Sequence, residues 1–228
     1  MQDIEVLNNK LQLLGKLAAS LAHEIRNPLS IIQLNLRYIE MSKDFEEIVE
    51  SVKSCKEAVD RIQRLVENTL DFSRANSLEK KMVNLNEIIN KACDIISLKA
   101  KMNDIFLLKL LDKNLPLVNV SFNKILQVYL NLMTNSIEAI GKRGRIIVSS
   151  RYLCEENVIY SEIIDNGKGI LEEDKEKIFQ DFFTSKSYGT GLGLGVCKRI
   201  LEEHQADIGF ESVYGEGARF YIKFKLTK

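Results

Sequence analysis

The chain has 228 residues, of which 45% are hydrophobic, so it can bury the core of one large domain or of two smaller ones. Lys and Arg number 32, as do Asp and Glu, and a formal net charge of zero gives no reason to expect nucleic acid or an anionic membrane as a partner. The sequence has no apolar run of the roughly 20 residues that a membrane helix needs, and no basic-then-apolar signal peptide. Its four cysteines form no C-x-x-C pair, so we expect free thiols in a reducing, cytoplasmic compartment and no zinc site.

The first 75 residues predict an antiparallel helical hairpin. Apolar residues recur at alternating steps of four and three from Leu7 to Ile25, and again from Ile48 to Thr69, on either side of a polar break at 41–44. One hairpin cannot bury both apolar stripes, whereas two hairpins can do so as a four-helix bundle. We therefore expect a homodimer through residues 1–78. The alternative is a coiled coil within one chain that docks on the second half.

The second half mixes helical and strand patterns. Helices are expected at 86–102, 122–140, 174–183 and 193–204, and strands at 105–111, 116–120, 144–153, 157–165, 207–212 and 218–226. Helices beside an antiparallel or mixed sheet indicate an α+β sandwich. The predicted organisation is thus an all-α hairpin at 1–78, a polar linker at 79–85 and an α+β domain at 86–228.

A histidine on the first helix is a candidate for covalent chemistry. The heptad phase turns Leu21 inward and places His23 about 200° around the helix from it, facing solvent. Asn27 lies on the same face, and Pro28 interrupts the helical hydrogen bonds and predicts a kink. A neutral imidazole can accept a phosphoryl group when a carboxylate such as that of Glu24 takes its proton. On these residues alone, an ordinary surface histidine in a kinked helix is the favoured interpretation.

Polar residues at two places in the second half indicate a ligand site. Asn131 and Asn135 share one face of an apolar helix, although Asn is a poor residue inside helices, and an amide oxygen can coordinate Mg²⁺ beside phosphates. Buried amides that tie the helix to neighbouring backbone are the alternative. Asp165 ends a strand before Gly167 and Gly169, where it could accept a hydrogen bond from an amine such as that of adenine. The same D-x-G-x-G string is also typical of ordinary turns.

A glycine-rich run at 189–195 opens the helix at 193–204. Unpaired N–H groups and the positive end of the helix dipole make such a start a phosphate site. A Rossmann fingerprint is excluded, because no βαβ unit surrounds the run and no acidic residue ends a strand about 20 residues later. We expect residues 171–190 to form a mobile lid from which Lys186 reaches a phosphate.

In their order and spacing, these motifs resemble the sensor histidine kinases of two-component systems. His23 to Pro28 read HEIRNP and match the phosphoacceptor box HExRNP of that family. The paired Asn residues, DNGKGI, IFQDFFTSK and GTGLGLG resemble the ATP-binding domain of Bergerat (GHKL) type, which histidine kinases share with gyrases, Hsp90 chaperones and MutL-type proteins. The resemblance implies that His23 is the phosphoacceptor, that Glu24 accepts its proton and that Asn27 positions water when a phosphorylated partner is dephosphorylated.

In the second domain, the resemblance implies that Asn135 holds Mg²⁺ and that Asp165 reads adenine. The further nucleotide contacts that it implies are Asn131, Gly167, Gly169, Ile170, Lys186, Gly189, Thr190, Gly191, Leu192, Gly193 and Leu194. Branches of the superfamily that hydrolyse ATP carry a Glu at the position of Asn131, so an external acceptor is favoured over water. Four positions depart from the common pattern and put nucleotide affinity in doubt: Ser121, Gly195, Gln205 and Ala218. His204, at the end of the last helix, is expected to cap or pack that helix.

The implied function is ATP-dependent autophosphorylation of His23, followed by transfer to an Asp of a response-regulator receiver domain and phosphatase activity on that partner. The alternative is a phosphatase-dominant or weakly active nucleotide-binding scaffold, and a plain ATPase is disfavoured by Asn131. Because heptad phase is already present at Leu7, we expect a sensor region or membrane anchor upstream of Met1. This segment itself is then cytoplasmic and makes no direct membrane contact.

Overall fold

The computed structural model describes residues 25–73, 79–180, 183–184 and 193–226. The chain divides into two compact units, Met1–Ser77 and Leu78–Lys228. All four cysteines are free thiols, as expected.

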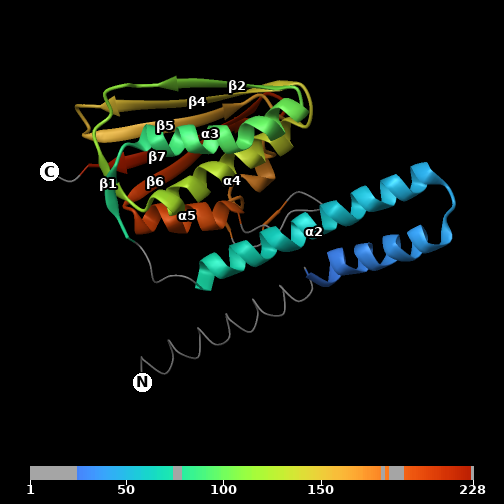
Figure 1. Cartoon of the computed structure of the whole chain (residues 1–228). Helices are drawn as coiled ribbons and strands as arrows, with labels where there is room; N and C mark the ends of the chain where they lie inside the picture. Colours follow the sequence, from blue (N-terminus) through green and yellow to red (C-terminus); the bar gives the residue numbers. More distant parts are fainter. Residues whose placement is uncertain (1–24, 74–78, 181–182, 185–192, 227–228) are drawn as a thin grey trace. The chain divides into compact units, whose positions relative to one another are not determined.

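The described part of the first unit is a helical hairpin (Figure 1). A helix over residues 25–41 leads through a three-residue connection to α2 (Phe45–Ser73), so the polar break predicts the turn correctly. Asp44 begins α2 as an N-cap, because its Oδ1 accepts the backbone N–H of Glu46 at 2.8 Å. Side-chain packing joins the two helices, since Cys55 Sγ lies 3.9 Å from the carbonyl oxygen of Ile32.

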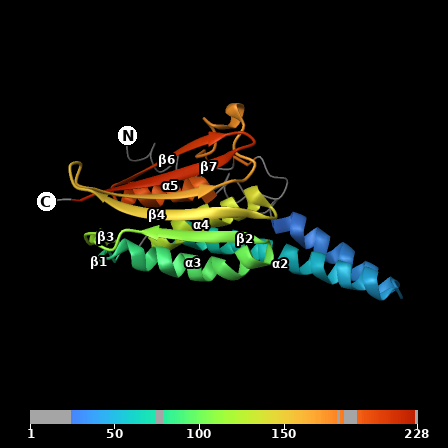
Figure 2. The same cartoon turned by 90° about the horizontal axis from the view of Figure 1, so that it is seen from above.

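The second unit is a two-layer α+β sandwich, as the sequence predicts. Its main sheet has the strand order β2-β4-β5-β7-β6, in which β2 pairs with β4 in parallel and every other pair is antiparallel. The strands are β2 (Ile105–Leu111), β4 (Gly144–Leu153), β5 (Val158–Asp165), β6 (Ala206–Val213) and β7 (Gly217–Lys225). The helices α3 (Leu85–Met102), α4 (Phe122–Ile140) and α5 (Gly193–Glu203) lie side by side on one face of this sheet (Figures 1 and 2).

Apolar residues at helical spacing and at alternate strand positions form the core between the two layers. α4 is the central helix, and its inward face is almost wholly removed from water. The sheet contributes every second residue of β4, β5 and β7, as expected for strands with one face packed on helices. The residues buried in this layer include Ile125, Val128, Tyr129, Leu132, Met133, Ile146, Val148, Ile159, Ile163, Phe220, Ile222 and Phe224.

Part of the segment predicted as a linker is folded. Within 79–85, β1 (Lys81–Val83) pairs with β3 (Val118–Val120) in a separate antiparallel ribbon. Leu85, at the end of the same segment, is fully buried as the first residue of α3. A three-residue strand is too short for an alternating pattern to stand out from a polar linker.

The helix predicted at 174–183 is wrong. The chain instead forms a short 3-10 helix, Glu172–Asp174, followed by turns in which Lys177 N–H bonds to Asp174 O and Gln180 N–H to Lys177 O. Ile178 is buried, and the ring of Phe179 meets that of Phe210 on β6 edge-on. Ile178 and Phe179 thus pack on the rest of the unit instead of continuing a helix, because tertiary contacts override the helical periodicity. The mobility expected for 171–190 stays a prediction, and residues 181–182 and 185–190 lie outside the described residues.

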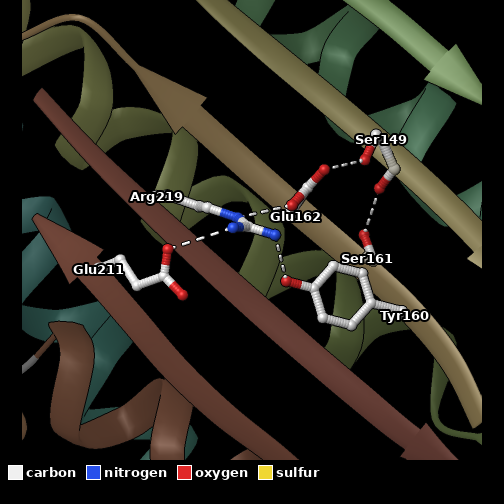
Figure 3. A network of polar contacts seen from close by, with 6 residues as sticks. All are labelled: Ser149, Tyr160, Ser161, Glu162, Glu211 and Arg219. Atoms are coloured by element: carbon white, nitrogen blue, oxygen red, sulfur yellow. Dashed lines mark hydrogen bonds and ion pairs between the residues drawn. The ribbon is translucent and has the colours of Figure 1, made fainter.

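The face of the sheet opposite the helices carries a network of polar side chains (Figure 3). Arg219 on β7 donates to Glu162 at 2.8 Å, to the hydroxyl of Tyr160 at 2.8 Å and to Glu211 at 3.1 Å. Glu162 also accepts from the hydroxyl of Ser149 on β4. The network therefore links four neighbouring strands across the open face.

Candidate functional site

The end of β5 carries a buried carboxylate that accepts hydrogen bonds from α4 and from the following loop. Asp165 is only 5% exposed. Its Oδ2 accepts from the hydroxyl of Ser136 on α4 at 2.9 Å, and its Oδ1 accepts from the backbone N–H of Gly167 at 2.9 Å. Both bonds fix the orientation of the carboxylate. The sequence analysis missed Ser136, and its signal was a small hydroxyl residue on the buried face of an apolar helix.

The glycines after Asp165 allow the backbone to pack closely on neighbouring elements. A Cβ on Gly167 would lie 2.7 Å from the carbonyl carbon of Ala139 on α4. Gly169 has a φ of 68°, and a Cβ there would collide with the backbone of Val213. The sequence argument assigned these glycines to close approach of a ligand, whereas the structure assigns them first to contacts within the protein.

Hydrogen bonds on both sides hold this loop between α4 and the β6–β7 turn. The backbone N–H of Lys168 bonds to Ala139 O at 3.1 Å, and that of Gly215 to Lys168 O at 2.8 Å. The backbone N–H of Ile170 donates to the hydroxyl of Ser212 at 2.9 Å, another residue that the sequence analysis missed. The loop is therefore preorganised beside Asp165.

The two asparagines lie one turn apart on α4, as predicted. The side-chain Nδ2 of Asn131 is buried and has no hydrogen-bond partner among the described residues. The side chain of Asn131 also lies next to the buried thiol of Cys197 on α5, which is only a weak hydrogen-bond acceptor. Asn135 is half-buried on the following turn. Its amide oxygen is a suitable ligand for Mg²⁺.

The first turn of α5 contains Gly193, Leu194 and Gly195, the three residues of the predicted phosphate loop at 189–195 that lie within the described residues. The N–H groups of this first turn have no partner within the helix, and the positive end of the dipole lies here. Further along α5, Cys197 is fully buried against α4, with its Sγ 3.9 Å from Val128 O. Burial raises the pKa of this thiol to about 12, so it packs as a neutral group.

Several predicted site residues lie outside the described residues: His23, Glu24, Lys186, Gly189, Thr190, Gly191 and Leu192. Asn27 is exposed on the helix over 25–41. Within the second unit, the described members of the site come from α4, the end of β5, the following loop and the start of α5.

The packing role expected for His204 is confirmed, and the ring packs as a neutral group. The imidazole is buried, and its Nε2 accepts the backbone N–H of Ser121 at 3.0 Å. Burial lowers the pKa of His204, so the side chain is a neutral acceptor rather than a cation at a helix end.

Two family models match the chain. The model for the "His Kinase A (phospho-acceptor) domain" matches residues 13–78, and that for the "Histidine kinase-, DNA gyrase B-, and HSP90-like ATPase" matches residues 122–228. The second match begins at the first residue of α4 and includes Asn131, Asp165 and α5.

Curated and structural relatives are similar over most of the chain. The sensor histidine kinase ZraS of Salmonella typhi is 37% identical over 214 residues, which are 93% of this chain and 46% of that protein. The catalytic domain of histidine kinase ThkA matches with a TM-score of 0.59 and 33% identity, covering 65% of this chain and 96% of that one. ThkA in complex with the response regulator TrrA matches with a TM-score of 0.78 and 30% identity, covering 95% of this chain and 63% of that one.

The chain thus spans about half the length of the curated relatives it matches. In the described part of the chain, no helix combines the length and apolarity needed to cross a membrane. One family assignment accounts for the hairpin, the mixed sheet with three helices, both family models and these relatives. The chain belongs to the sensor histidine kinase family.

Proposed function

We propose that this chain uses ATP to phosphorylate His23 and passes the phosphoryl group to an Asp on a response-regulator receiver domain. One observation carries the proposal: the same chain joins a hairpin that matches the phosphoacceptor model to a unit with an anchored, buried carboxylate at Asp165. The first part offers an acceptor and the second a site for the donor.

In the nucleotide site, Asp165 accepts a hydrogen bond from the exocyclic amine of adenine. The hydroxyl of Ser136 and the backbone N–H of Gly167 support this role, because they hold the carboxylate in one orientation. The buried Nδ2 of Asn131, which has only the weak acceptor sulfur of Cys197 beside it, donates to a phosphate oxygen. The start of α5 faces the remaining phosphate charge.

The protein groups at this site fit a divalent cation that is held jointly by the protein, the phosphates and water. No cluster of three His, Cys, Asp or Glu side chains exists among the described residues, so the protein alone offers no complete metal cage there. Mg²⁺ is commonly held by one or two protein oxygens together with phosphate oxygens and water. Asn135 supplies such an oxygen, and the metal supplies charge neutralisation on the phosphates.

The transfer step needs an acceptor and a proton sink. A ring nitrogen of His23 forms a P–N bond to the γ-phosphorus while the P–O bond to the β-phosphate breaks, which leaves ADP. Glu24 takes the imidazole proton. Water competes poorly, because Asn131 is a neutral amide at the position where the hydrolysing relatives carry a Glu. Positioning and charge neutralisation supply most of the rate, as in other phosphoryl transfers.

The partner of this reaction docks on the hairpin around His23. The complex of ThkA with the response regulator TrrA supports a partner of this class. Asn27 is exposed on the helix over 25–41, four residues after His23, where it can position water against a phosphorylated partner. The chain therefore also acts as a phosphatase on the receiver domain.

The hairpin functions as a dimer. Six residues line a groove between its two helices: Leu36, Ile39, Val52, Cys55, Lys56 and Val59. Leu36, Val52 and Val59 are exposed in the single chain, although they are apolar. A second hairpin on this groove completes a four-helix bundle.

Labelling with γ-³²P-ATP tests the kinase proposal. We expect acid-labile, base-stable label on the chain and none on His23→Ala, followed by transfer to an added receiver domain. Acid-labile label that persists in His23→Ala would contradict the assignment of His23. A single-turnover experiment distinguishes the phosphatase-dominant alternative from the kinase proposal. A phosphatase-dominant chain removes the label from a phosphorylated receiver domain but gains no label from ATP.

A further inference from the structure

His204 connects the end of α5 to the beginning of α4. The ring is only 6% exposed, and both of its nitrogens have partners. Nε2 lies 3.0 Å from the backbone nitrogen of Ser121, which can only donate, so Nε2 is unprotonated. Nδ1 lies 2.6 Å from Ile200 O, which can only accept, so Nδ1 carries the proton. The two contacts together require the neutral imidazole and one tautomer.

This contact anchors the start of a helix that its own N-cap side chain does not cap. Ser121 is the N-cap residue of α4, and its own side chain makes no capping hydrogen bond. α4 is also the helix that carries Asn131 and Asn135. A displacement at its first turn would therefore be transmitted along a rigid helix to both asparagines.

A second contact shows that the two helices pack antiparallel with a fixed register. Cys197 Sγ on α5 meets Val128 O on α4, which is seven residues beyond Ser121, while Cys197 is seven residues before His204. Seven residues of α-helix span about 10 Å. Three residues further along, the same register brings Asn131 level with Leu194, in the first turn of α5. The His204 contact and the nucleotide site thus lie at opposite ends of one helix pair.

We propose that His204 is a positioning residue for the nucleotide site, in which the neutral imidazole locks α5 against α4 and its protonation releases the lock and weakens nucleotide binding. The proposal rests on the nucleotide binding proposed above and names a residue that controls it from a distance of roughly 15 Å.

The charges around the ring decide how protonation acts. A proton on Nε2 would face the N–H of Ser121, so two donors would oppose each other in a buried place. Lys80, which precedes β1, and Lys124 on α4 also disfavour the cation, whereas Glu203 and the carbonyl of Ile200 on α5 favour it. Burial is the largest cause, and the pKa of His204 is lowered.

The lowered pKa of His204 determines how the stability of the fold changes with pH. Because the pKa is lower in the folded chain than the usual value of about 6.5, the neutral ring adds stability at higher pH. That contribution decreases as the pH falls below about 6.5 and is lost once the pH passes through the folded-state pKa.

The test compares His204→Gln with His204→Leu. The Gln side chain places an acceptor oxygen near the position of Nε2 and does not titrate, whereas Leu fills the space and leaves the N–H of Ser121 without an acceptor. Ser150→Ala is the matched control, because it also removes a buried hydrogen bond, that of Ser150 to Asn86 on α3, at a distance from the α4–α5 pair. Calorimetric titration with ADP from pH 5.5 to 8 measures affinity, and urea unfolding measures stability.

We expect His204→Leu to bind ADP on the order of tenfold more weakly than the unaltered chain at pH 8, and Ser150→Ala to bind it equally well. His204→Gln should bind within about threefold of the unaltered chain. Nucleotide phosphates titrate in the same pH range, so the affinity of the unaltered chain must be compared with that of His204→Gln at each pH. The ratio of the first affinity to the second should decrease as the pH is lowered. A constant ratio, or unimpaired binding by His204→Leu, overturns this inference alone. Failure of the unaltered chain to bind ADP overturns the proposed function as well.

Discussion

A single residue after α5 has a backbone conformation that its side chain disfavours. Gln205 has a φ of 54°, in the left-handed region, and it immediately follows the final turn of the helix. Glycine adopts this conformation without a Cβ clash and is the usual residue at such a helix end. We predict that Gln205→Gly stabilises the second unit by roughly 0.5–1 kcal/mol, as measured by urea unfolding.

Gln205→Ala is the control for this prediction, because alanine retains a Cβ and shortens the side chain. It should leave stability almost unchanged, and equal stabilisation by Gly and Ala would mean that backbone strain is not the cause. The sequence indicated this position, since family members commonly carry Gly there. It did not indicate the strain, which is visible only in the backbone angles.

Substitutions at Asp165 test the proposed nucleotide site at the scale of a single residue. We predict that Asp165→Asn weakens ATP binding at least tenfold, because the amide replaces one charged acceptor oxygen by a donor. Ser136→Ala should weaken binding less, since it removes one hydrogen bond that orients the carboxylate and keeps the charge. Fluorescent-nucleotide titration measures both. Equal affinity in Asp165→Asn and the unaltered chain would contradict the adenine-reading role.

The same residues indicate what the sequence could predict of the site. Asn131 and Asn135 were identified because Asn is unusual in the interior of an apolar helix, and Asp165 because it ends a strand directly before two glycines at alternate positions. Ser136 was not identified, because a serine on a buried helix face has many ordinary roles. Its bond to Asp165 joins residues 29 positions apart, and no local pattern specifies such a partner.

At the scale of elements, long segments were predictable and short ones were not. α3, α4 and the β4–β5 hairpin follow from helical periodicity and strand composition over eight or more residues. The segment at 174–183 also has helical periodicity, but Ile178 and Phe179 gain more by packing against β6 than by continuing a helix. The parallel pairing of β2 with β4 depends on long-range contacts and was left open between an antiparallel and a mixed sheet.

The open face of the main sheet supplies a prediction at this scale. Arg219 and Glu162 are 33% and 12% exposed, so their ion pair is partly shielded from water and is supported by Tyr160 and Ser149 (Figure 3). In a double-mutant cycle with Arg219→Ala and Glu162→Ala, we predict a coupling free energy of about 1 kcal/mol or more.

The pair Lys225–Asp207 is the control for that cycle. It joins β7 to β6 at 2.8 Å, but its side chains are 65% and 59% exposed. Solvent screening should reduce its coupling to nearly zero, and 1 M salt should reduce it further. If both cycles gave the same coupling, partial burial would not explain the strength of the Arg219 network.

At the scale of the whole molecule, the order of motifs carried more information than any one of them. HEIRNP, the paired asparagines and the glycine-rich loop each permit an ordinary interpretation, but the chain contains all of them in one order. The proposed transfer from a nucleotide site on one unit to a histidine on the other also requires that the two units meet during the reaction. The sequence alone specifies the two parts of such a reaction and not the arrangement in which they react.

The assembly of two chains is the remaining prediction at this scale. The groove between the helices of the hairpin exposes Leu36 on one helix and Val52 on the other, in a position where a second hairpin would cover them. A carboxylate at either position would be buried without a partner in the dimer, while in the single chain it would face water. We predict that Leu36→Asp and Val52→Asp each raise the dimer dissociation constant more than about 100-fold and leave the helix content unchanged.

Lys53→Asp is the matched control, because Lys53 is exposed next to Val52 and does not line the groove. Sedimentation equilibrium measures the dissociation constants, and a Leu36→Asp chain that dimerises as tightly as Lys53→Asp would exclude this groove as the dimer interface.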